Sequence, residues 1–280
     1  GLDFTFTNTL NYPIYIESYV DGDSVTVNIW GVEERAANRT IAFTSTRTTD
    51  FVWKDPLYVQ RVDDVNRDPE RVKRLMRSYA RFQGSQSSFT EICKDMEANE
   101  KSGLDENTIS SYLNALRQIF VVEDMHAWNP NLRSKTAIRS TDTRYFVDPS
   151  IATAALGLGP EDLMNDLETF GLLFETLSVR DLRVFSQALD GEVYHYRDKS
   201  GLECDAVVHL RNGSYGLIEI KLGGDRLIEE GSKTLSTLAA KIDTTRMKNP
   251  AFLMILTATG GFAYRRKDGV YVVPIGCLKD

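Results

Sequence analysis

Hydrophobic and polar residues alternate in the first fifty residues of the chain. The period is two, as at Ile14 and Ile16, which is typical of β-strands with one buried face. Asp21-Gly22 lies between two such runs and indicates a hairpin turn. We therefore expect three or four antiparallel strands within residues 2–47, too few for a stable independent sheet.

The period becomes helical in the middle of the chain, over residues 51–148. Pro69 is at a first-turn position, Ser88 and Glu91 have capping-box spacing, and Asp105 is placed to cap a third helix. Two strands are then expected in the segments FVVEDMHAW and TRYFVD. Three helices followed by a β-hairpin predict a winged helix-turn-helix domain.

The third predicted helix is the element that such a domain offers to a DNA groove. Many winged helices instead serve as docking or linker modules, and both interpretations stay open. A basic cluster on the first helix also gives a candidate phosphate-contacting surface: Arg71, Lys73, Arg74, Arg77 and Arg81. The candidate nucleic-acid-binding residues of the third helix are Asn107, Thr108, Ser110, Ser111, Asn114 and Arg117.

Residues 149–280 predict a third domain, in which helices and strands are mixed. One long or broken helix covers PEDLMNDLETFGLLFETLSVRDLRVFSQAL, and a final hairpin carries Asp268-Gly269. The order helix, three strands, helix, strand predicts an α+β or mixed α/β fold of the restriction-endonuclease type. The elements expected between the long helix and the hairpin are strands at 192–197, 202–210 and 215–222, a helix at 226–246 and a buried strand at 251–258.

Four residues of this last segment form a candidate catalytic set. Asp205, followed after thirteen residues by Glu219-Ile-Lys221, is the PD-(D/E)XK nuclease pattern, and Glu175 lies on the preceding helix. Asp205 and Glu219 are candidate ligands of Mg²⁺, which prefers carboxylate oxygens and retains several waters. Such a metal lowers the pKa of a bound water, and Lys221 is expected to position that water or offset charge. The alternative is that these residues lie on a solvent-exposed strand face and form an ordinary surface ion pair.

The register of the two strands sets a condition on this hypothesis. A two-residue loop at Asn212-Gly213 would place Asp205 opposite Ile220, with its side chain on the wrong face. A three-residue loop or a bulge would place Asp205 opposite Lys221, on the face of Glu219. We therefore predict an odd loop or a bulge between 208 and 215, with Glu203 joining the same face.

Composition and charge narrow the classes of function. The net charge is −7, divided as −4 over residues 1–50, +1 over 51–140 and −4 over 141–280, so nucleic-acid contact is expected only in the middle segment. No apolar run is long enough for a membrane helix, and no secretory signal opens the chain. The three cysteines lie far apart without metal spacing, which predicts reduced thiols and a cytoplasmic location.

Two resemblances extend this interpretation. The segment NYPIYIESYVDGDSVTVNIWG resembles the C-terminal strands of VanW-like proteins and implies no activity. From about Phe51 onward, segments such as RYFVDPSIATAALG and YHYRDKSGLECDAVV resemble the C-terminal half of a bacterial and archaeal family of AAA-type ATPases. That resemblance implies a winged helix followed by a PD-(D/E)XK-like domain. The residues that match the nuclease-fold positions are Glu175, Asp205, Glu219 and Lys221.

The chain departs from those ATPases in lacking a phosphate-binding loop. Its nearest string, Gly231-Ser-Lys-Thr234, lacks the glycine beside the lysine and lies in a predicted helix, so no ATP binding or hydrolysis is expected. The absence suggests a truncated or fused reading frame. The resulting function is a nucleic-acid-associated module, a candidate Mg²⁺-dependent phosphodiesterase acting on DNA. The alternative is a non-catalytic module that docks a partner protein.

Overall fold

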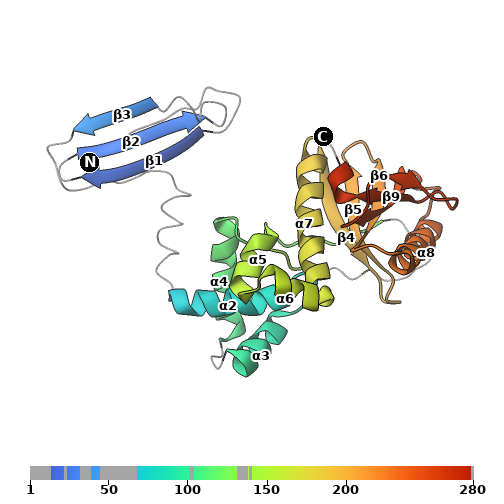
Figure 1. The fold of residues 1–280 in the computed structure, drawn as a ribbon, viewed down its shortest axis with the longest axis horizontal. Coiled ribbons are helices and arrows are strands. Elements are labelled where there is room, and N and C mark those ends of the chain that lie inside the picture. Colours follow the sequence, from blue (N-terminus) through green and yellow to red (C-terminus); the bar gives the residue numbers. More distant parts are fainter. Residues whose placement is uncertain are drawn as a thin grey trace. The chain divides into compact units, whose positions relative to one another are not determined.

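The computed structural model describes residues 14–21, 24–31, 39–44, 68–100, 104–130, 138 and 141–278 (Figure 1). The chain divides into two compact units, residues 1–66 and residues 67–280. The expected boundaries at 50/51 and 148/149 stay predictions. The first unit contains one antiparallel sheet with the order β1-β2-β3, which confirms the expected strands: β1 (Ile14–Asp21), β2 (Ser24–Gly31) and β3 (Arg39–Thr44).

The second unit begins with three capped helices. Ser88 accepts a bond from the Glu91 N–H and Glu91 in turn accepts from the Ser88 N–H, so the predicted capping box forms. Asp105 accepts from the Thr108 N–H at the start of the third helix. Each cap satisfies backbone N–H groups that have no partner inside the helix. The helices are α2 (Pro69–Arg81), α3 (Phe89–Asn99) and α4 (Glu106–Gln118).

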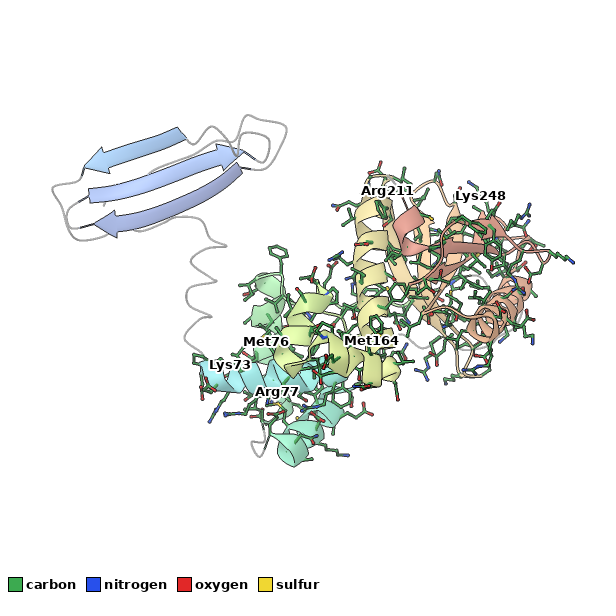
Figure 2. The ribbon with its side chains drawn as sticks, viewed as in Figure 1. Lys73, Met76, Arg77, Met164, Arg211 and Lys248 are labelled. Atoms are coloured by element: carbon green, nitrogen blue, oxygen red, sulfur yellow. The ribbon has the colours of Figure 1, made fainter. Side chains whose placement is uncertain are left out.

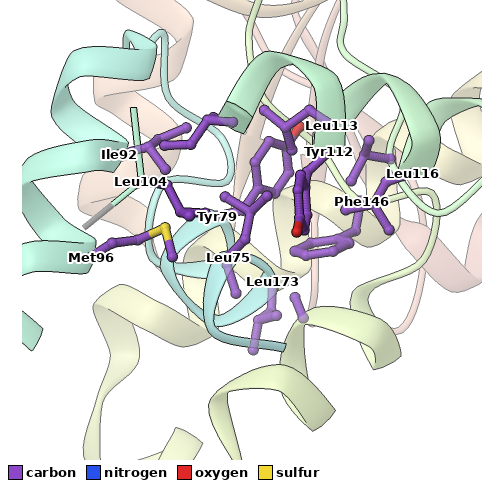
Figure 3. Packing of buried hydrophobic residues seen from close by; sticks show 14 residues of the cluster. Leu75, Tyr79, Ile92, Met96, Leu104, Tyr112, Leu113, Leu116, Phe146 and Leu173 are labelled. Atoms are coloured by element: carbon purple, nitrogen blue, oxygen red, sulfur yellow. The ribbon is translucent and has the colours of Figure 1, made fainter. Parts of the chain in front are cut away.

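Apolar side chains from these helices form one buried core, which Phe146 and Leu173 join from later in the chain (Figure 3). The apolar period of each helix places its buried residues on the side that faces the others. The core residues that Figure 3 labels on the helices are Leu75, Tyr79, Ile92, Met96, Tyr112, Leu113 and Leu116.

The two strands expected after α4 form only in part, which corrects that prediction. Single antiparallel pairs join Val122 to Phe146 and Met125 to Thr143. Beyond Met125 the chain turns away to strand β4 (Gly191–Arg197), where the Trp128 N–H donates to the His195 carbonyl at 2.6 Å. The backbone groups that would extend the hairpin are therefore satisfied by another strand.

Three helices precede the large sheet. The long helix expected here is broken at Asp166, whose carboxylate caps the following helix by accepting from the Thr169 N–H at 3.1 Å. The helices are α5 (Pro149–Leu156), α6 (Pro160–Asn165) and α7 (Leu167–Gln187).

The large sheet has six strands, in the order β4-β5-β6-β7-β9-β8. It is mixed, because β6 pairs in parallel with β7 and β7 with β9, whereas the other pairs are antiparallel. The elements are β4 (Gly191–Arg197), β5 (Glu203–Leu210), β6 (Tyr215–Lys221), α8 (Asp225–Lys241), β7 (Phe252–Thr257), β8 (Tyr264–Arg265) and β9 (Tyr271–Pro274).

One helix covers each face of this sheet (Figure 1). Phe174 and Leu182 of α7 pack with Ile218 on one face, and Leu235 of α8 packs with Leu217 on the other. The order α7-β4-β5-β6-α8-β7 is the expected one, and the α+β class is confirmed. Among the described residues, no helix combines the length and apolar character that crossing a membrane requires.

Helix α8 is shorter than predicted. It ends at Lys241 rather than near residue 246, because Ile242 is extended and the Asp243 carboxylate accepts from the Thr245 N–H at 3.1 Å. The string Gly231–Thr234 lies inside α8, as predicted, and is therefore not a phosphate-binding loop.

A cluster of carboxylates and one lysine

The β5–β6 hairpin has the odd loop that the sequence required. Leu210 donates its N–H to the Ser214 carbonyl, which leaves a loop of residues 211–213, and Gly213 there has φ 79°. That left-handed conformation suits glycine, which has no Cβ to clash. The regular pairing ends at Ala206 with Ile218, so one further step would oppose Asp205 to Glu219. The predicted odd loop is confirmed, but the expected opposition of Asp205 to Lys221 is wrong.

A second irregularity lies on the other side of β5. Tyr194 pairs with Val207 and Tyr196 with Cys204, so Asp205 and Ala206 together oppose a single residue of β4. This extra residue is a β-bulge. Cys204 and Val207 consequently pack in the same core although they are three positions apart, whereas a regular strand would place them on opposite faces.

The bulge directs the Asp205 carboxylate toward the end of β6. Asp205 Oδ2 accepts from the Ile220 N–H at 2.7 Å, and this side-chain bond takes the place of the next backbone rung. The same oxygen accepts from Lys221 Nζ at 2.9 Å. Lys221 Nζ also contacts Glu219 Oε2 at 2.8 Å, so the ammonium joins the two carboxylates.

Glu219 is the most enclosed of these groups. Its side chain is 5% exposed, compared with 19% for Asp205 and 24% for Lys221. Burial, together with the negative charge of Asp205, raises the pKa of Glu219 to about 8. Burial alone would lower the pKa of Lys221, but Asp205 and Glu219 hold it above its usual value. Glu219 Oε1 is buried and has no hydrogen-bond partner among the described residues.

Glu175 reaches this cluster from α7. Burial and the charge of Asp205 raise the pKa of Glu175 to about 8, and a hydrogen bond from the Tyr145 hydroxyl to Glu175 Oε1 partly opposes that rise. Tyr145 comes from the segment before α5, and Gly84 of the helical part also lies against the Glu175 carboxylate. The helical part of the second unit therefore contributes directly to the surroundings of the cluster.

The sequence analysis did not identify Tyr145 or Gly231 as part of this site. A Cβ added to Gly231 of α8 would lie 3.4 Å from the Glu219 Cβ, so this glycine allows the helix to lie close over Glu219. No local pattern marks Tyr145, because its contact depends on how two segments pack. Glu203 was expected to join the face of the cluster, but it does not, because it is exposed and pairs with Arg197 at 2.9 Å.

The oxygen atoms of Glu175, Asp205 and Glu219 meet the requirements of a hard cation such as Mg²⁺ only in part. All three carboxyl groups offer oxygen atoms, and the orphaned Glu219 Oε1 is an available ligand. Within the described part of the chain, however, no three acidic, histidine or cysteine side chains are grouped to hold a metal ion. Two carboxylates are enough for Mg²⁺ where waters and substrate phosphates complete its coordination. Asp205 and Glu219 therefore fit as a two-ligand site.

The candidate DNA-binding residues on α4 are divided between exposed and internal roles. Asn107, Ser111 and Asn114 are exposed, and the Thr108 hydroxyl donates to the Asp105 cap at 2.7 Å. Ser110 is half-buried. Arg117 is held inward, because its guanidinium donates to Asp124 Oδ2 at 2.5 Å and to Asn114 Oδ1 at 2.8 Å.

The basic cluster on α2 is largely neutralised by nearby acids and carbonyls. Lys73 pairs with Glu70 at 2.8 Å, Arg77 donates to the Ala155 carbonyl, and Arg81 pairs with Asp95 and Glu100; Lys73 and Arg77 are labelled on this helix in Figure 2. Arg71 lies 3.4 Å from Asp68. Exposed pairs of this kind remain exchangeable, so a phosphate would compete with them. Arg74 has no ion-pair partner among the described residues, and its buried Nε makes no hydrogen bond.

Taken together, the fold and the cluster define an α+β protein in which a lysine joins two acidic groups where β6, an interior strand of a mixed sheet, ends. Two families match the chain, each described as a domain of unknown function: DUF8612 over residues 34–162 and DUF4143 over residues 170–278. The second match includes Glu175, Asp205, Glu219 and Lys221. Searches of curated proteins and of solved structures gave no match to the chain.

Proposed function

We propose that the cluster of Glu175, Asp205, Glu219 and Lys221 is the site of a Mg²⁺-dependent phosphodiesterase that acts on nucleic acid. The observation that carries this proposal is the position of Lys221, whose ammonium lies within 2.9 Å of Asp205 and 2.8 Å of Glu219. A solvated strand face would leave these groups separate and exposed. Here Asp205, Glu219 and Lys221 are at most 24% exposed, and one ammonium contacts both carboxylates.

Asp205 and Glu219 would hold the metal ion. A bound Mg²⁺ supplies an acidified water and stabilises negative charge on a phosphate. Burial is the main cause of the raised pKa values of Glu175 and Glu219, and the negative charge of Asp205 adds to it, so ionising these acids would leave negative charge that one ammonium does not balance. A divalent cation would relieve that excess.

The other residues would position and neutralise. Lys221 keeps its proton, because both carboxylates raise its pKa, and so it offers a fixed positive charge beside the phosphate. The charges of Asp205, Lys221 and Glu219 also act on Glu175. The Tyr145 hydroxyl donates a hydrogen bond to the Glu175 carboxyl group and orients it. Glu175, with a pKa of about 8, is therefore an acid that can exchange protons near neutral pH.

We further propose that α2, α3, α4 and the chain after them form a winged helix that contacts DNA. The exposed residues Asn107, Ser111 and Asn114, together with Thr108, support this role for α4. Arg117 supports it less, because its guanidinium is engaged with Asp124. The contact would therefore depend on uncharged hydrogen-bonding groups.

The resemblance to the C-terminal half of AAA-type ATPases belongs to the same proposal. It accounts for the order of a helical part and a nuclease-like sheet, and the VanW-like resemblance concerns only the first unit. The sequence has no phosphate-binding loop, so the proposed activity requires no ATP.

The test is cleavage of plasmid and oligonucleotide substrates by the full chain with Mg²⁺ or Mn²⁺ and, separately, with chelator. Metal-dependent nicking that Glu219→Gln and Lys221→Ala abolish is expected. Glu203→Gln is a matched control, because Glu203 is an exposed acid on β5, the strand of Asp205, and pairs only with Arg197 among the described residues. Calorimetric titration with Mn²⁺ gives a second readout, in which Glu219→Gln should weaken binding. Absence of cleavage on single-stranded, duplex and branched substrates would reject the proposal.

A specific observation also favours a second candidate, a non-catalytic docking module. The Lys221 ammonium already contacts both Asp205 and Glu219, and the described residues contain no group of three metal ligands. Under this alternative the lysine replaces the metal and the cluster is structural. A salt titration separates the two, because phosphate binding weakens steeply with salt whereas apolar docking does not.

A further inference from the structure

An exposed aromatic edge lies on the β8–β9 hairpin. Phe262 is 72% exposed, Tyr264 42% and Tyr271 40%. The Phe262 and Tyr264 rings lie 6.1 Å apart, and the Arg265 guanidinium lies 5.5 Å from the Tyr271 ring centre. Large aromatic side chains normally bury most of their surface, so this grouping at a sheet edge indicates a binding surface.

The aromatic edge is in line with the carboxylate cluster. Tyr264 pairs with Val272, Val272 with Ile255, and Ile255 with Glu219, so all four residues lie in one row across four strands. Three strand spacings separate Tyr264 from Glu219, which is about 14 Å. Val272 and Ile255 pack in the core beneath α8, so Tyr264 and Glu219 belong to the same face of the sheet.

The loop before β8 brings Phe262 to the end of the sheet where Lys221 lies. Lys221 is opposite Thr257, the last residue of β7. The chain leaves β7 there, and the Thr259 hydroxyl donates to the carbonyl of Leu222, the residue after Lys221, at 3.4 Å. Phe262 follows within this loop. No strand has to be crossed to pass from the loop to the cluster.

Basic side chains accompany the aromatic ones. Arg265 donates from Nε to the Gly269 carbonyl, which leaves the rest of its guanidinium over Tyr271. Arg266 is engaged with Glu229 and Asp268. Lys267 is exposed and has no ion-pair partner among the described residues. The hairpin therefore offers cations next to flat rings.

We propose that this aromatic edge binds single-stranded nucleic acid by stacking bases on Phe262 and Tyr264 while Lys267 contacts phosphates. Arg265 and Tyr271 pair with each other one position further along the strands, so they lie on the other face of the sheet and are not part of this surface. Every base has a flat face, so aromatic side chains with neighbouring cations bind single strands without sequence preference. A duplex keeps its bases stacked inside and cannot use such a surface. This proposal rests on the proposed phosphodiesterase and assigns it a single-stranded substrate. Helix α8 covers Val272 and Ile255 between Tyr264 and Glu219, so the strand would reach the cluster along the loop before β8 and not across that face.

The test is fluorescence polarisation of the full chain with a labelled oligothymidylate, in chelator so that no cleavage occurs. Phe262→Ala should weaken binding about 5- to 150-fold, as removal of one stacked base contact does. Phe262→Leu should weaken it similarly, because leucine keeps the apolar surface but has no ring, whereas Phe262→Trp should retain binding. Leu189→Ala removes an equally exposed apolar side chain elsewhere and should change nothing. Lys267→Gln should lower the salt slope by about 0.7.

Several outcomes would overturn the inference. One is binding that Phe262→Ala and Tyr264→Ala leave unchanged, and another is equal affinity for duplex of the same length. A third is the absence of oligonucleotide binding. If the chain instead associates with itself or with another protein, and Phe262→Leu preserves that association, the edge is a protein-docking strand. Because this test needs neither metal nor cleavage, its failure is distinguishable from failure of the phosphodiesterase proposal.

Discussion

The carboxyl group of Glu219 makes the stability of the fold depend on pH in an unusual direction. Its pKa is raised from 4.5 in the unfolded chain to about 8 in the folded protein. Below pH 4.5 both states are protonated. Between the two values only the folded state keeps the proton, so stability falls as pH rises and reaches its lowest value above pH 8.

The magnitude follows from the shift. Each unit of pKa corresponds to 1.36 kcal/mol, so the full shift destabilises the fold at high pH by up to about 5 kcal/mol. Glu175 titrates nearby, and removal of one charge relaxes the other. We therefore expect Glu219→Gln to gain about 2 to 5 kcal/mol over the wild type near pH 9, relative to the difference near pH 5.

Urea unfolding at several pH values, in chelator and with tryptophan fluorescence, measures this difference. Trp128 is 6% exposed in the core beneath α8 and reports on that part of the molecule. Glu203→Gln, an exposed acid on β5, should show no pH-dependent gain. If the free energies of unfolding of wild type and Glu219→Gln differ equally at both pH extremes, Glu219 is not desolvated as described and the reasoning fails.

Three further perturbations test the packing around the cluster. Tyr145→Phe removes the hydrogen bond that lowers the pKa of Glu175, so that pKa should rise by about one unit; NMR titration of ¹³C-labelled carboxyl groups measures it, and an unchanged value would refute the contact. Arg117→Ala removes one of the cations around Asp124, which is 6% exposed, and should cost about 1 to 3 kcal/mol in thermal unfolding; a cost below about 0.5 kcal/mol would show that the arginine is free for DNA. Gly231→Leu should force α8 away from the sheet at a cost of about 1 to 3 kcal/mol, whereas Gly231→Ala should be tolerated; equal melting temperatures for both would contradict the close approach.

Local patterns predicted most of the elements in the second unit. The capping box at Ser88 and Glu91 forms because it depends only on neighbouring residues, and the strands expected at 202–210 and 215–222 form as β5 and β6. The three-residue loop followed from the requirement that Asp205 and Glu219 share a face. These predictions needed no knowledge of distant segments.

Other features depend on contacts between distant segments and had no local signal. The β5 bulge arises where the strand pairs with β4, and Tyr145 meets Glu175 because two parts of the chain pack together. Arg117 was predicted to face a DNA groove, yet the buried carboxylate of Asp124 turns it inward. A sequence pattern indicates which face a side chain occupies, but not which partner will engage it.

Because of the extra residue in β5, the arrangement of the cluster depends on the number of residues in this part of the strand more than on which side chains they carry. Losing one amino acid between Cys204 and Val207 would restore an even phase, rotate Asp205 away and turn one core residue toward the opposite side. Conservative replacements nearby would leave the arrangement intact. We therefore expect relatives to have no insertion or deletion between the positions of Cys204 and Val207, even where the side chains in this segment vary.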